Sequence, residues 1–124
     1  MKKNGSYLSL DYGTHKSWLA YSVEGFCFAY KTIPTAELLD FLPSWISEKK
    51  AEAIIIGMPY NIDGTESTHC IKVRKFAKEL EKTIHIPIFL HDERLTTSEA
   101  RLWGVDDIDA ESARLILAEY LLSD

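Results

Sequence analysis

The sequence predicts an α/β fold in which helices cover both faces of one mixed five-stranded sheet. Three observations predict it: three short strands lie together near the N-terminus, two apolar strands follow at 52–59 and 86–91, and segments of helical periodicity separate and follow these two strands. The chain has 124 residues, enough for one domain with a hydrophobic core, so we expect residues 1–124 to form a single domain.

The N-terminal third predicts an antiparallel meander over residues 6–31. In "SYLSLDY" (6–12) apolar and polar residues alternate, so Leu8 and Leu10 face one way while Ser9 and Asp11 face the other. The strands "SWLAYSV" (17–23) and "FCFAYK" (26–31) flank the short turn Glu24-Gly25. Each strand should therefore pair with the one before it.

A first helix is expected to begin after Thr35, which we interpret as its N-cap. Pro43 should kink or restart this helix, because proline lacks the backbone N–H that an inner turn needs. The helical spacing places four apolar side chains on one face: Leu38, Leu42, Trp45 and Ile46.

The second half alternates strands and helices. "EAIIIGMP" (52–59) is a continuous apolar strand of the kind covered on both faces. A loop and a helix at about 66–83 follow, then the strand "IPIFLH" (86–91). Thr96 and Glu99 fit a capping box for a short helix ending near Gly104, and a final helix runs from about 109 to 122.

Composition limits the functional classes. The formal net charge of −5 argues against nucleic-acid binding by bulk attraction, but it allows a local basic patch or an acidic site for a cation. No apolar run approaches the ~20 residues of a membrane span, so no membrane partner is expected, and no signal peptide is evident. Cys27 and Cys70 lack metal-ligand spacing, which indicates reduced thiols and a cytoplasmic protein.

Acidic residues mark one edge of the predicted sheet, where ligands of open α/β sheets gather. Asp11 ends the first strand and Glu93 follows the last one. Asp109 falls within the apolar arc of the final helix, either as its N-cap or as a carboxylate aimed at the sheet edge. Clustered carboxylates stay ionised only beside a cation, and Mg²⁺ prefers oxygen ligands.

Five segments occur in the order typical of one family: "LSLDYGTHK", "IIIGMPYNIDGTES", "VRKFAKELE", "DERLTTSEA" and "DAESARLILAEYL". The chain resembles the YqgF/RuvX family of ribonuclease H-like proteins over nearly its whole length. The resemblance implies that Asp11, Glu93 and Asp109 hold Mg²⁺ (or Mn²⁺) and form the catalytic site of an endonuclease that hydrolyses phosphodiester bonds. It implies structured nucleic acid as the substrate, with the 5′ end of precursor 16S rRNA preferred over a DNA Holliday junction.

Further residues are candidates for nucleic-acid contact. The loop "NIDGTEST" ends at a helix N-terminus, where free N–H groups favour phosphate, although an ordinary Asp-Gly turn with a cap explains it equally well. The helix after it carries a lysine-rich side, which is either a phosphate-binding patch or a solvated face. Arg94 either binds phosphate or pairs with Asp92. The candidates are Lys16, Asn61, Thr65, Ser67, Lys72, Lys75 and Arg94.

Two rival functions remain open. "LDYGTHKSWLAYS" also resembles the first phosphate loop of actin-like ATPases, but those proteins need two such domains around a cleft. A binding or scaffold role without cleavage is the other rival, because Thr14 leads to His15, Lys16, Ser17 and Trp18 where the family usually has a lysine-arginine pair followed by isoleucine and glycine. We expect Trp18, Trp45 and Trp103 to belong to the core.

Overall fold

The computed structural model describes residues 5–92 and 108–122, without the side chains of 108–111. The elements are β1 (Tyr7–Asp11), β2 (Lys16–Val23), β3 (Phe26–Pro34), the 3₁₀ turn η1 (Thr35–Glu37), α1 (Leu38–Lys49), β4 (Ala53–Met58), α2 (Thr68–Glu81), β5 (Ile88–Asp92) and α4 (Ile108–Leu122). In the described ranges, no helix is long and apolar enough to cross a membrane.

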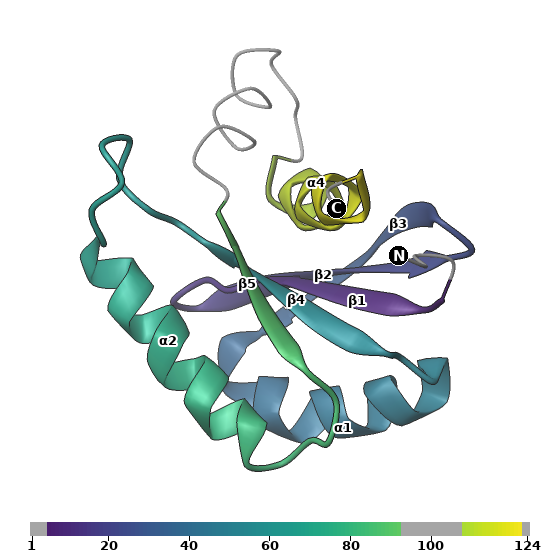
Figure 1. The fold of residues 1–124 in the computed structure, drawn as a ribbon. Helices are drawn as coiled ribbons and strands as arrows, with labels where there is room; N and C mark the ends of the chain where they lie inside the picture. The colour runs from purple at the N-terminus through teal and green to yellow at the C-terminus, as the bar shows by residue number, and fades with distance from the viewer. Residues whose placement is uncertain (1–4, 93–107, 123–124) are drawn as a thin grey trace.

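The strands form one mixed sheet in the order β3-β2-β1-β4-β5. β1 pairs antiparallel with β2, β2 pairs antiparallel with β3, and the two later strands run parallel to β1. α1 and α2 cover one face and α4 covers the other (Figure 1). This architecture confirms the predicted meander continued by two parallel strands, with helices on both faces.

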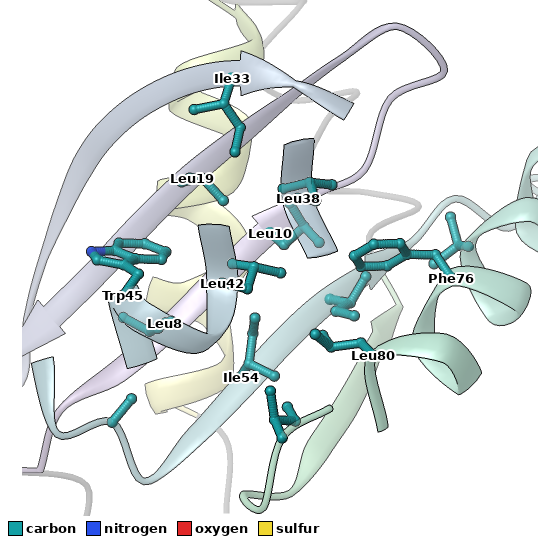
Figure 2. Close-up of a cluster of buried hydrophobic side chains, with 14 of the residues drawn as sticks. Leu8, Leu10, Leu19, Ile33, Leu38, Leu42, Trp45, Ile54, Phe76 and Leu80 are labelled. Carbon is teal, nitrogen blue, oxygen red and sulfur yellow. The ribbon is translucent and has the colours of Figure 1, made fainter. Parts of the chain in front are cut away.

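The larger core lies between the sheet and the α1/α2 layer (Figure 2). Leu38, Leu42 and Trp45 of α1 are almost completely buried, as the helical spacing predicts. Phe76 and Leu80 project from α2 toward the same cluster. The side chains of β1 and β4 that fill it are Leu8, Leu10, Ile54, Ile56 and Met58.

A smaller core lies between the sheet and α4. Ile55 faces this side, opposite to its neighbours in β4, and packs with Ile116 and Leu117. The hydroxyl of Ser9 donates a hydrogen bond of 2.7 Å to the carbonyl oxygen of Ala113. Because β1 and β4 are covered on both faces, they carry almost no exposed surface, and β4 is buried at every residue.

The predicted N-cap of the first helix was wrong, and of the two effects predicted for Pro43 the restart is not found. Thr35 is not an N-cap, because its hydroxyl donates to the carbonyl oxygen of Gly13 at 2.7 Å and it begins η1. Pro43 does not restart the helix, since α1 continues through it to Lys49. The burial of Leu42 and Trp45 on either side of Pro43 offsets the backbone hydrogen bond that proline cannot make. The capping box of Thr96 and Glu99 lies outside the described residues.

Candidate functional site

The candidate site lies at the carboxyl end of β1, on the face that α4 covers. Leu8 and Leu10 belong to the α1/α2 core, so strand alternation turns Ser9 and Asp11 toward α4. Asp11 is only partly buried, and Ser9 is fully buried. The position that the sequence predicts for Asp11, at the strand end and opposite to Leu10, is therefore confirmed.

The helix α4 runs antiparallel to β1. Tyr7, at the start of β1, lies beside Tyr120 near the end of α4, with ring centroids 6.2 Å apart. Ser9, further along β1, bonds Ala113, which is nearer to the start of α4. One more step of two residues along β1 reaches Asp11, and one helical turn back from Ala113 reaches Asp109. The first turn of α4 therefore lies toward the same edge as Asp11.

The parallel pairing of β1, β4 and β5 places the carboxyl end of β5 at the same edge of the sheet as Asp11. Leu10 pairs with Ile56, and Gly57 pairs with His91, so extending the register by one residue puts Asp11, Gly57 and His91 in one row. Gly57 has no side chain to separate the other two. His91 faces α4, with its Nε2 3.2 Å from Oε1 of Glu119. β5 ends at Asp92, and Glu93 follows directly in the sequence.

The described side chains alone do not form a metal site. Among residues 5–92 and 112–122, no three His, Cys, Asp or Glu residues are grouped closely enough to hold a metal ion. Glu93, Arg94 and the side chain of Asp109 lie outside the described residues. The triad of Asp11, Glu93 and Asp109 therefore stays a prediction.

The loop after Asp11 is held from two directions. Its Gly13 N–H donates to the hydroxyl of Ser17 at 3.1 Å, and its Gly13 carbonyl accepts from Thr35. From α2, Nε2 of His69 lies 2.7 Å from the carbonyl oxygen of Tyr12. These contacts position the chain beside Asp11, and no sequence pattern indicated Ser17 or His69.

Gly13 also has a steric reason to be glycine. A Cβ atom there would lie 2.1 Å from the carbonyl oxygen of Lys16 and 2.9 Å from a ring carbon of Trp18. Trp18 is paired directly with Asp11 across β1 and β2, so both side chains share the α4 face. Trp18 is only partly buried, whereas Trp45 belongs to the core as predicted.

The predicted contacts before α2 are already engaged within the protein. The amide of Asn61 donates to Oγ1 of Thr65 at 3.0 Å, and that hydroxyl donates to Asp63 at 2.7 Å. Ser67 caps α2 by accepting from the N–H of Cys70. The structure does not test phosphate binding here, so these three contacts stay predictions.

The same loop contains Glu66, which forms an ion pair with an arginine of α2. Arg74 of α2 binds both carboxylate oxygens of Glu66, with its shortest contact at 2.6 Å. Hydrogen bonding to Arg74 lowers the pKa of Glu66 below its ordinary value. The guanidinium of Arg74 therefore binds the end of the loop that precedes α2.

A cavity of about 460 Å³ adjoins the candidate site on the opposite face of the sheet. Tyr12, the residue after Asp11, lines it together with Lys72 and Lys75 of α2. The same cavity is bordered by Thr14 and Thr35. Two of the predicted nucleic-acid contacts, Lys72 and Lys75, are thus brought together beside Tyr12, on the other face of the sheet from Asp11. Lys16 is exposed at the start of β2 on the same side of that strand as Trp18, and therefore on the face of Asp11.

The fold is that of the ribonuclease H-like class. It matches the Thermus thermophilus RuvC structure solved in complex with a Holliday junction substrate, with a TM-score of 0.59, 8% identity, and coverage of 94% of this chain and 93% of that chain. A second Thermus thermophilus RuvC structure matches with a TM-score of 0.57 and 11% identity, over the same shares of both chains.

The sequence comparison is more specific. The RuvX family, described as Holliday junction resolvase, matches residues 5–123, and the chain belongs to this family. A Pseudomonas fluorescens protein named "Putative pre-16S rRNA nuclease" is 36% identical, with 92% of this chain and 90% of the relative covered. A Sodalis glossinidius protein of the same name is 31% identical, with 98% of this chain and 96% of the relative covered. The resemblance identified from the five sequence segments is therefore confirmed.

Proposed function

We propose that this protein is a divalent-metal-dependent nuclease that trims the 5′ end of precursor 16S rRNA. The observation that carries the proposal is the position of Asp11, which ends β1 on the face covered by α4, whose first turn contains Asp109. Relatives of at least 31% identity that span nearly the whole chain carry the name of a pre-16S rRNA nuclease. A DNA junction, named in the family description, is the alternative substrate.

The donor set fits a hard cation. Asp11, Glu93 and Asp109 supply carboxylate oxygens from three separate segments, and Mg²⁺ and Mn²⁺ both accept such ligands. When bound, such ions activate a water molecule for attack on phosphorus and stabilise the departing oxygen. The role of the three carboxylates is to hold the cation at the sheet edge. The hydrogen bonds to the backbone of Tyr12 and Gly13 help to position Asp11 there.

A binding role without cleavage is the second candidate. Trp18 favours it, because its bulky ring stands across from Asp11 where the family usually has a small residue. A single experiment on the purified protein distinguishes the two functions.

The experiment measures cleavage of a precursor 16S rRNA fragment and of a DNA junction while the Mg²⁺ concentration is varied. We expect the wild type to cut the RNA only with metal, and the Asp11→Asn and Glu93→Gln variants to bind it without cutting. The same proteins are melted with and without Mg²⁺, since a ligand of the folded state raises the melting temperature. A wild type that binds RNA but leaves it intact at every metal concentration would establish the binding role instead.

A further inference from the structure

The cavity beside Tyr12 has the properties of a nucleotide-binding pocket. Its volume of about 460 Å³ falls within the range of small-ligand sites, roughly 300–1,000 Å³. One wall consists of η1 and the start of α1, and the other consists of α2. A space of this volume suits one unpaired nucleotide better than a duplex.

The lining combines cations with apolar surface. Lys72, Lys75, Phe76 and Glu79 lie on one side of α2, because they are spaced by three, four and seven residues. The two ammonium groups suit a phosphate, and the ring of Tyr12, packed on Phe76 with centroids 4.9 Å apart, suits a base or sugar. Ala36 and Leu39 complete the apolar wall. The protein as a whole is acidic, so this attraction is local to the cavity.

The pocket lies at the same end of β1 as Asp11 but on the other face of the sheet. Asp11 turns toward α4, and its neighbour Tyr12 turns toward α1 and α2. A strand that crosses the carboxyl edge of the sheet passes from one side to the other within a few nucleotides. We propose that this pocket holds an unpaired nucleotide of the substrate strand close to the cut, with its phosphate between Lys72 and Lys75.

This inference rests on the proposed function for the identity of the strand, but it is tested through binding alone. Wild type and Asp11→Asn are titrated without divalent metal against a short single-stranded RNA, a duplex of the same sequence and a single mononucleotide. Lys72→Ala/Lys75→Ala is compared with Lys78→Ala/Lys82→Ala, a control that removes the same charge from the last turn of α2 and its C-cap, outside the pocket.

We expect the pocket variant to weaken single-strand binding by about tenfold or more and the control variant to have a much smaller effect. The salt dependence should decrease by roughly 0.7 per lost phosphate contact in the pocket variant only. Ala36→Trp, which fills the cavity from an exposed position without changing charge, should weaken binding comparably. Glu79→Gln, which removes the acid from the lining, should strengthen it.

Chemical shifts of the backbone amides locate the ligand independently of affinity. Single-stranded RNA should shift the signals of Thr14, Ala36 and Lys72 in wild type and in Asp11→Asn. Equal effects of the two lysine pairs, or full binding by Ala36→Trp, would replace the pocket with a diffuse basic surface. Mononucleotide binding as tight as that of the oligonucleotide would identify a free nucleotide as the occupant and overturn the substrate-strand proposal. Intact pocket binding without any RNA cleavage would instead reject only the proposed nuclease activity.

Discussion

Ser9 of β1 and Ser112 of α4 are both buried, but only one hydroxyl has a hydrogen-bond partner in the described part of the chain. Ser9 donates to the carbonyl of Ala113, which ties α4 to β1. The hydroxyl of Ser112 has no partner there. A buried hydroxyl without a partner loses its hydration and gains nothing in return.

We therefore expect opposite effects from the same substitution at these two positions. Ser112→Ala should raise the free energy of unfolding by up to ~1 kcal/mol, because alanine removes the unpaired hydroxyl and favours the helix. Ser9→Ala should lower it by about 1 kcal/mol. Urea denaturation measures both. A loss of stability in Ser112→Ala that equals the loss in Ser9→Ala would mean that the Ser112 hydroxyl is bonded.

Glycines 13 and 25 provide a second contrast at single residues. In Gly13→Ala the new methyl group would overlap the carbonyl oxygen of Lys16, so the loop after Asp11 must move. Gly25 has open space around it but a φ of +88°, so Gly25→Ala meets only backbone strain of about 1–2 kcal/mol.

Both variants should be less stable, but only Gly13→Ala should also weaken the response to metal, because it moves the loop beside Asp11. Thermal melting with increasing Mg²⁺ measures both quantities. If Gly13→Ala retains the full increase in melting temperature with Mg²⁺, the geometry of this loop does not matter for the metal site.

At the scale of elements, the helix α2 performs three tasks with different side chains. Val73, Phe76 and Leu80 pack on the sheet. Arg74 holds the preceding loop through Glu66, and His69 holds the loop after β1. Lys72 and Lys75 line the cavity. The helix predicted at about 66–83 is confirmed, but the separate roles of its polar residues follow only from their neighbours.

The contact between Arg74 and Glu66 predicts a pH dependence of the loop. The pKa of Glu66 is lowered in the folded protein. The contact therefore stabilises the fold at pH values above the ordinary pKa of 4.5, and this stabilisation is lost as the pH falls through the lowered pKa. An NMR titration of the Glu66 carboxyl carbon should give a midpoint below 4.5 in wild type. Arg74→Gln should return the midpoint to its ordinary range, and Lys78→Gln should leave it unchanged. A normal midpoint in wild type would show that the ion pair does not persist in solution.

For the whole molecule, one sheet joins two cores that serve different purposes. The α1/α2 side contains most of the large buried side chains. The α4 side is smaller, and it connects β1 to the helix that carries Asp109. We therefore expect packing on this side to affect both stability and the proposed metal site.

Two neighbouring isoleucines of β4 test this division. Ile55 and Ile56 are both fully buried, Ile55 against α4 and Ile56 against α1 and α2. Each change to alanine should lower the free energy of unfolding by about 2–5 kcal/mol, as measured by denaturant unfolding. Only Ile55→Ala should also reduce Mg²⁺ affinity, because it weakens the packing of α4 on the sheet. Equal Mg²⁺ affinity in the two variants would show that the packing of α4 does not control the metal site.

Much of this protein is determined by local sequence patterns. Alternation in residues 6–12 correctly predicts which face receives Asp11, because side chains of a strand point to opposite sides in turn. Helical spacing likewise predicts the buried face of α1, and the five sequence segments predict the family.

Only the tertiary structure decides the contacts between distant segments. Thr35 looks like a helix cap in the sequence, yet it bonds Gly13, which lies 22 residues away. His69 reaches Tyr12 across 57 residues, and the cavity combines loop, 3₁₀ and helix residues that share no motif. A sequence pattern shows only the side-chain periodicity within one helix or strand. It contains no information on which side chains meet when separate elements pack, because that depends on strand order and on how each helix crosses the sheet.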